Sequence, residues 1–172
     1  MAHAASLDAS LMAEEQARLD DWLVAAAPSI DAAEIRRYPG PSWVLDFDDG
    51  LIVQAQPDAE RKQLVLTGSL GLPYPGTELA AYRMLLEIGA WWPVTGGMSL
   101  ALDPDSGIIL QIIDVALQDL DAAHLQASLA TFLGRARHLR AALDGLQSMG
   151  PGAPAREAPW AEVLGYPGAL RI

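Results

Sequence analysis

Cysteine is absent from this sequence of 172 residues. A chain without thiols forms no disulfide framework and offers no thiolate ligands for zinc. Basic residues are few as well, since 11 Lys and Arg stand against 22 Asp and Glu, for a formal net charge of −11. None of them gathers into the basic patch that a nucleic-acid or anionic-membrane binder needs. We therefore expect neither nucleic acid nor a membrane among the partners.

Long apolar runs are also missing. No stretch of about 18 consecutive apolar residues occurs, so we expect no membrane-spanning helix. The first residues, Met1 to Ser6, lack the basic region and apolar core of a secretory signal. Hydrophobic residues still make up 51% of the chain, which is enough for a core. These features predict a cytoplasmic protein with one domain, residues 1–147, and a Pro- and Gly-rich C-terminal tail, residues 148–172.

Two turn signals between apolar runs predict β-hairpins. The first is Asp103-Pro-Asp-Ser-Gly107, between residues 98–102 and 108–113, and the second is Asp48-Asp-Gly50, between residues 43–47 and 51–56. Pro presets a turn dihedral, Asp bonds its own backbone and Gly accepts a positive φ. Residues 63–70 alternate leucines with polar or small residues and predict a third strand of the second hairpin's sheet.

Two helical segments are predicted before the hairpin that turns at residues 48–50. Apolar residues at three- and four-residue spacing indicate a helix from a cap at Ser6 or Asp8 to about Ala26. A shorter segment of one or two turns is expected at residues 32–37.

Two more helices follow the strands. One, capped by Thr77, is expected from Glu78 to about Ala90 with its apolar face at residues 79, 82, 85, 86 and 89. The last begins after a cap at Asp119 or Asp121, and three late arginines are expected to favour its negative end. Its apolar stripe consists of Leu125, Leu129, Phe132, Leu133, Ala136, Leu139 and Leu143, and the late arginines are Arg135, Arg137 and Arg140. The order α-β-β-β-α-β-β-α predicts an α+β fold, with helices on one face of an antiparallel sheet.

Motifs for chemistry are absent or incomplete. Counting an EF-hand from Asp46 or from Asp103 places Leu51 or Ile108 where the required glycine should stand. The two histidines of the last helix, His124 and His138, are too far apart to share a metal on one helix face. No Gly-x-Ser-x-Gly elbow and no Gly-rich phosphate loop with its Lys-Ser/Thr pair occurs. We predict no catalytic residue, no metal site, no cofactor and no enzymatic activity.

Trp91 and Trp92 are adjacent, so at a helix end their side chains point about 100° apart. One reading places one ring in the core and leaves the other partly exposed. The other reading, which we favour, is a subunit interface, where aromatic anchors are enriched.

One stretch carries a family likeness. It runs Thr95-Gly-Gly-Met-Ser-Leu-Ala-Leu-Asp103 to Gly107, and the Leu-x-x-x-Leu-x-x-Phe-Leu pattern at residues 125–133 follows it. Together with the element order over residues 6–143, it resembles the class I type III secretion chaperones, the Tir-chaperone (CesT-like) family. This resemblance implies a cytoplasmic homodimer without enzymatic activity, which holds the N-terminal chaperone-binding segment of a secreted effector in an extended, secretion-competent state.

The resemblance also implies two sites. The helix at residues 78–90 and the strand at residues 98–102 would form the dimer interface, and the first helix with the first three strands would form an apolar groove for the effector. The implied interface residues are Leu79, Tyr82, Leu85, Leu86, Trp91, Trp92, Met98 and Leu100. The implied groove residues are Leu11, Leu19, Leu23, Val44, Leu51, Val53, Leu64 and Leu66. Each groove residue can equally belong to an ordinary core, because burial is what apolar periodicity mostly reports.

Two other functions stay open on the sequence. One is a stand-alone regulatory or structural protein on the same scaffold, unrelated to secretion, because fold alone does not fix function. The other is a small hydrolase, which would need a pocket with a nucleophile and a base in reach. A short apolar patch in the tail, Trp160 to Leu164, either docks on the body or stays apart from it.

Overall fold

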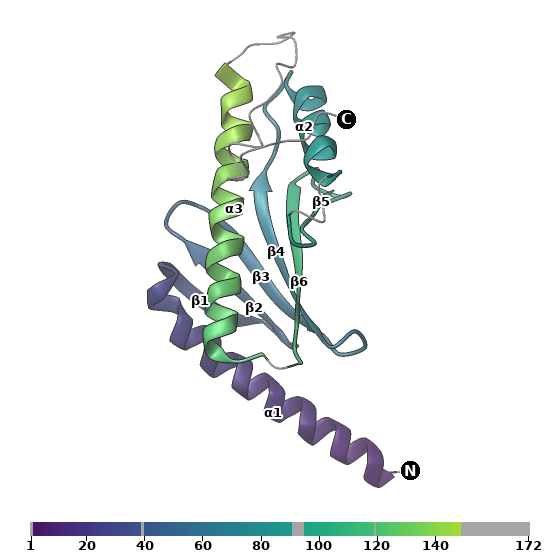
Figure 1. The fold of residues 1–172 in the computed structure, drawn as a ribbon. Coiled ribbons are helices and arrows are strands. Elements are labelled where there is room, and N and C mark those ends of the chain that lie inside the picture. Colours follow the sequence, from purple (N-terminus) through teal and green to yellow (C-terminus); the bar gives the residue numbers. More distant parts are fainter. Residues whose placement is uncertain (1, 39, 91–94, 119, 149–172) are drawn as a thin grey trace.

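The computed structural model describes residues 2–38, 40–90, 95–118 and 120–148, and for residues 2–13 and 148 it describes the backbone alone. Within these ranges the chain forms three α-helices, one short 3-10 helix and six strands (Figure 1). In chain order they are α1 (Ala2–Ala26), η1 (Ala27–Ser29), β1 (Ala32–Tyr38), β2 (Ser42–Phe47), β3 (Ile52–Asp58), β4 (Gln63–Gly71), α2 (Glu78–Gly89), β5 (Ser99–Leu102), β6 (Ile109–Ala116) and α3 (Ala122–Ser148).

The six strands form one sheet of order β1-β2-β3-β4-β6-β5, in which every neighbouring pair is antiparallel. The longest pairing joins β4 to β6, from Gln63 opposite Ala116 to Gly71 opposite Ile109. Both predicted hairpins are confirmed, as β2–β3 and β5–β6. The sheet therefore ends in two edge strands, β1 on one side and β5 on the other.

Strands β2 and β4 alternate buried and half-buried residues because successive side chains point to opposite faces. In β2, Trp43, Leu45 and Phe47 are buried, and in β4 the leucines 64, 66 and 70 are. Helix α3 lies along this buried face, α1 crosses near the start of α3, and α2 stands beside β5 (Figure 1). The predicted α+β class is thus confirmed, with the helices on one face of the sheet.

Helix α3 packs on the sheet through the predicted stripe, and all seven of its residues are buried. Gly68 of β4 makes room for Phe132, since a Cβ there would lie 3.0 Å from the ring atoms Cε1 and Cζ. Opposite Gly68, the buried Gln111 of β6 donates its Nε2–H to the Phe132 carbonyl oxygen at 3.1 Å. Residues 68, 111 and 132 therefore fix α3 against the centre of the sheet.

The prediction of a helical segment at residues 32–37 is wrong, because these residues form strand β1. They pair with β2 in register, with Ile35 opposite Leu45 and Arg37 opposite Trp43. The segment has little apolar pattern of its own, and its pairing partner decides the conformation, as is common for edge strands. The sheet gains a fourth consecutive strand, so the element order is α-β-β-β-β-α-β-β-α.

The predicted helix caps have mixed outcomes. Asp121 caps α3, because its Oδ1 accepts the His124 backbone N–H at 2.7 Å. Helix α1 begins at Ala2, so Ser6 and Asp8 lie inside the helix and do not cap it. Thr77 occupies the N-cap position of α2, but its hydroxyl donates to the Tyr74 carbonyl instead of accepting from the helix. The alternative cap Asp119 lies outside the described residues.

The expected role of the three late arginines is wrong, because α3 continues to Ser148 and leaves them in its middle. Arg135 Nη1 donates to the Thr95 carbonyl oxygen at 2.6 Å. Arg137 Nε donates to Asp49 Oδ2 at 2.8 Å, and Arg140 Nη1 lies 3.8 Å from Asp49 Oδ1. The arginines tie the β2–β3 turn and the segment before β5 to the helix.

Asp49 should make the stability of the fold depend on acid pH. Burial by itself would raise the pKa of its carboxyl, but the hydrogen bonds from Arg137 and from the Leu51 backbone, with the charges of Arg137 and Arg140, lower the pKa below the ordinary value of an aspartate. A carboxyl whose pKa is lower in the folded state contributes its full stabilisation above the unfolded pKa of about 3.9 and loses it as the pH falls through the folded pKa.

We expect Asp49→Asn to lower the urea midpoint at pH 7 and to flatten its decline below about pH 4. The comparison uses urea unfolding at pH 7, 4 and 3. Asp48→Asn, in the same turn, serves as the matched control. Equal pH profiles for the two variants would contradict this role of Asp49.

In the described part of the chain, no helix combines the length and the apolar character needed to cross a bilayer.

Candidate functional site

Helix α1 and the edge strand β1 form the first candidate surface, which we call the α1–β1 margin. Asp20 of α1 accepts hydrogen bonds from Arg37 Nη1 of β1, at 2.7 Å, and from Trp43 Nε1 of β2. Val24 follows Asp20 by one turn on the same helix face and is 64% exposed. Ile35 shares the Arg37 face of β1 and is half-buried. The margin therefore offers apolar surface beside an unpaired strand edge.

The charges of β1 already have partners. Arg37 pairs with Asp20, and Arg36 Nη2 lies 2.6 Å from Asp46 Oδ2. Because the Asp46 hydrogen bond and charge stabilise the Arg36 guanidinium, they raise its pKa. Exposed pairs of this kind add little stability. What β1 offers to another chain is therefore chiefly its free backbone groups, which can pair with an added strand of almost any sequence.

The structure separates the predicted groove residues into three groups. Six of them are buried in the core and face no solvent in this chain: Leu19, Leu23, Leu51, Val53, Leu64 and Leu66. Val44 is half-buried on the other face of β2, and the Leu11 side chain lies outside the described residues. The sequence left a core role open for each of them, and the structure places these six residues in the core. Effector contact at the predicted groove residues stays a prediction.

Helix α2 provides the second candidate surface, because it is apolar on two sides. Its inner stripe, Ala81, Met84, Leu85 and Ile88, is buried against the body. On the outside, Leu79 and Leu86 stand two turns apart and are 83% and 76% exposed. A helix that is apolar all round is normally buried all round. The outer side of α2 is therefore suited to being covered by another chain segment.

The predicted dimer-interface residues fall partly on this outer side. Leu79 and Leu86 are exposed, while Tyr82 and Leu100 are half-buried against the core. Leu85 and Met98 are buried within the chain, so they do not offer a free surface. Trp91 and Trp92 lie outside the described residues. The predicted apolar face of α2 thus combined its outer side with Leu85 of the inner stripe and missed Ala81, Met84 and Ile88.

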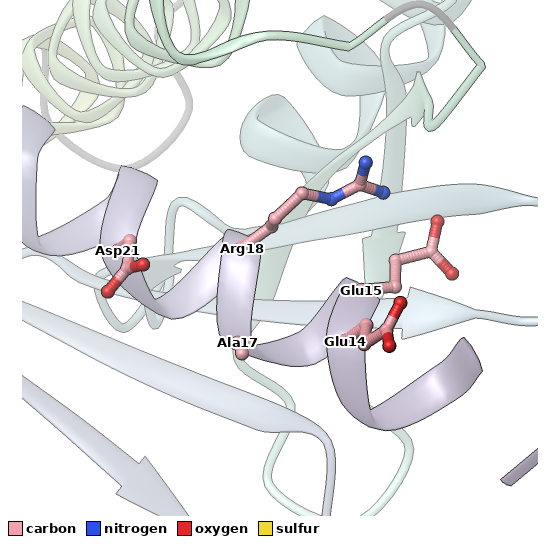
Figure 2. Close-up of a pocket in the computed structure, with 5 residues that line it drawn as sticks. All are labelled: Glu14, Glu15, Ala17, Arg18 and Asp21. Atoms are coloured by element: carbon pink, nitrogen blue, oxygen red, sulfur yellow. The ribbon is translucent and has the colours of Figure 1, made fainter. Parts of the chain in front are cut away.

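An open hollow of about 560 Å³ lies along α1 (Figure 2). Its lining residues all belong to this one helix: Glu14, Glu15, Ala17, Arg18 and Asp21. Small-molecule sites enclose most of the ligand surface, and a hollow walled by one helix does not. Among the residues that the structure describes, no group of three or more His, Asp or Glu side chains is placed to hold a metal ion.

Comparison of the sequence with family profiles identifies the scaffold. The profile of the Tir chaperone protein (CesT) family matches residues 40–140, more than half of the chain. The chain belongs to the Tir chaperone family. The resemblance found in the sequence is thereby confirmed. In this CesT-family chain the matched stretch begins just before β2 and ends within α3, so α1 and β1 precede it.

Solved structures share the fold of this Tir-family chain. A chain of the ExsC–ExsE complex matches with a TM-score of 0.63 and 19% identity, over 74% of this chain and 95% of that one. A chain of the HopA1–SchA chaperone–effector complex matches with a TM-score of 0.56 and 17% identity, over 73% and 95%. A chain of the Yersinia pestis complex between the type III secretion chaperone SycH and a fragment of YscM2 matches with a TM-score of 0.50 and 22% identity, over 69% and 97%. No curated protein matches the sequence.

Sequence reasoning did not name Val24 and Asp20, which belong to the α1–β1 margin, as candidate site residues. Val24 stands outside the apolar stripe of α1, formed by Leu19, Leu23 and Ala26, and this off-stripe position was the available signal for an exposed apolar residue. The Asp20 contacts with β1 and β2 had no local signal, because they depend on how α1 crosses the sheet.

Proposed function

We propose that this chain is a type III secretion chaperone that works as a homodimer in the bacterial cytoplasm. It binds the N-terminal chaperone-binding segment of a secreted effector and keeps that segment extended and competent for secretion. It does so by binding alone, without catalysis, metal or cofactor. The family match over residues 40–140 is the observation that carries the proposal.

The two candidate surfaces support a division of work. At the α1–β1 margin, an extended client can add a strand to β1 and place apolar side chains on Val24 and Ile35. At the opposite edge of the sheet, the outer side of α2 can meet the same side of a second copy, as a two-fold interface requires. Each copy thus keeps one surface for the client and one for its partner.

Co-expression with the secreted protein encoded beside this chain tests the proposal. We expect a stable complex of two chaperone chains and one effector, measured by size-exclusion chromatography with light scattering. Failure to bind any secreted protein would favour a regulatory or structural role on the same scaffold.

One substitution tests the α1–β1 margin. Val24→Glu places a carboxylate at a position that an apolar side chain of the client would cover, so the charge would lose its water without gaining a partner. We expect effector binding to be at least about 10-fold weaker, which corresponds to about 1.4 kcal/mol. Ala25→Glu is the matched control, because it adds the same charge to an exposed position on a different side of α1. Equal effector affinity of the two variants, measured by calorimetry, would place the client elsewhere.

A further inference from the structure

Five exposed hydrophobic residues lie on α2, in the segment before it and at the end of β5, the strand that α2 contacts. Leu72 and Tyr74 precede α2, Leu79 and Leu86 lie on its outer side, and Leu102 ends β5. Leu72 also reaches the β5–β6 turn, since a Cβ on Gly107 would lie 3.7 Å from Leu72 Cδ2. We call these five residues the outer α2 surface. Exposed apolar clusters of this kind mark interaction sites.

The chain has a segment of matching chemistry after α3. Residues 149–172 contain two arginines and two glutamates, so their formal charges cancel, and the whole net charge of −11 belongs to residues 1–148. Residues 149–159 include two glycines and three prolines, and the apolar residues Trp160, Val163 and Leu164 follow. A segment without net charge can approach the acidic body without the repulsion that a second body of the same charge meets.

The distance from α3 to α2 suits this segment. Helix α3 ends at the same end of the molecule as α2 (Figure 1), and the two helices are in contact. Twelve residues lead from Ser148 to Trp160, and such a length spans at most about 40 Å. Helix α2, with its 12 residues, is about 18 Å long. The segment is therefore long enough for its apolar residues to reach α2.

We propose that the outer α2 surface is a docking site for the chain's own C-terminal segment, with Trp160, Val163 and Leu164 as anchors. A tethered segment meets its site at an effective concentration in the millimolar range, whereas a second copy meets it only at the protein concentration. Docking and the joining of two copies through α2 then exclude each other. The mutual exclusion of docking and dimerisation rests on the proposed function, whereas docking itself does not.

The absence of cysteine gives a direct test in the full chain. Leu79→Cys combined with Val163→Cys is treated with a short bismaleimide, and Val24→Cys combined with Val163→Cys is the matched control, with its first thiol at an exposed site near the end of α1. We expect a cross-link within one chain that forms at least 10-fold faster than in the control and at a rate independent of protein concentration. Equal rates in the two proteins would overturn docking, and so would products that join two chains only.

The mutual exclusion of docking and dimerisation has its own test. In the full chain, Val163→Asp with Leu164→Asp should strengthen dimerisation at least 10-fold relative to Ala155→Asp with Ala158→Asp, which adds the same charges before the anchors. Sedimentation equilibrium measures the dimer dissociation constants of the two double variants. Equal dissociation constants would overturn the mutual exclusion of docking and dimerisation. If neither protein dimerises while the cross-link within one chain still forms, docking stands and the proposed homodimer fails.

Discussion

Replacing Phe132 by alanine should lower the free energy of unfolding by about 3–5 kcal/mol. Phe132 is fully buried between α3 and the sheet, where its ring fills the space above Gly68. Removing the ring leaves a cavity that the paired strands β4 and β6 are too well connected to close. Urea unfolding followed by circular dichroism measures the loss, and Thr131→Ala, at the exposed neighbouring position of the same helix, should change stability by no more than about 0.5 kcal/mol.

A second variant tests the close packing of the Phe132 ring against Gly68. Gly68→Ala alone should destabilise the protein, because the new methyl group meets the Phe132 ring at 3.0 Å. In the Phe132→Ala background the same methyl group enters the cavity instead. We expect the double variant to be more stable than the sum of the two single losses predicts. Strict additivity would contradict the packing described for this contact.

Replacing Leu86 by glutamate should separate the proposed dimer. The side chain is 76% exposed in the single chain, so the fold of the protomer and its thermal midpoint should hardly change. At an interface through α2, the same glutamate would be buried among apolar groups without a cation. We expect the dissociation constant to rise at least about 100-fold, which corresponds to about 2.7 kcal/mol.

Sedimentation velocity over a range of concentrations measures this change. Val24→Glu is the control, since it adds the same charge to an exposed apolar residue of the α1–β1 margin and should leave the dimer intact. An unchanged sedimentation coefficient for Leu86→Glu, or equal weakening by both variants, would rule out α2 as the interface.

The parts of the fold with strong local signals were predictable from the sequence. Asp49-Gly50 and the turn before Gly107 join the strands of the two predicted hairpins, which the structure confirms, and both glycines have positive φ. The stripe of α3 was correct throughout because one continuous side of that helix packs on the sheet. Strong periodicity and turn chemistry act within a few residues, so they can be read without knowing the tertiary structure.

The errors have a common physical cause. A sequence pattern shows that a face is apolar, but it does not show which other element of the fold packs against that face. Strand β1 has only Ile35 as a large aliphatic side chain between Ala32 and Tyr38, so its pairing with β2 left no periodic signal. Helix α2 is apolar on two sides, and periodicity alone could not tell which of them, that of Leu86 or that of Ile88, faces inward. The predicted groove residues such as Leu64 were correctly read as apolar, but the covering helices make them core.

Helix α3 has one more consequence for the two surfaces. It runs without a break for 27 residues, about 40 Å, from beside α1 to the level of α2 (Figure 1). The client would bind beside β1 and a second copy at α2 beside β5, so the two places lie at opposite edges of the sheet on which this helix packs. Perturbations so far apart are energetically independent, so a chain carrying both Val24→Glu and Leu86→Glu should show the simple sum of two separate defects.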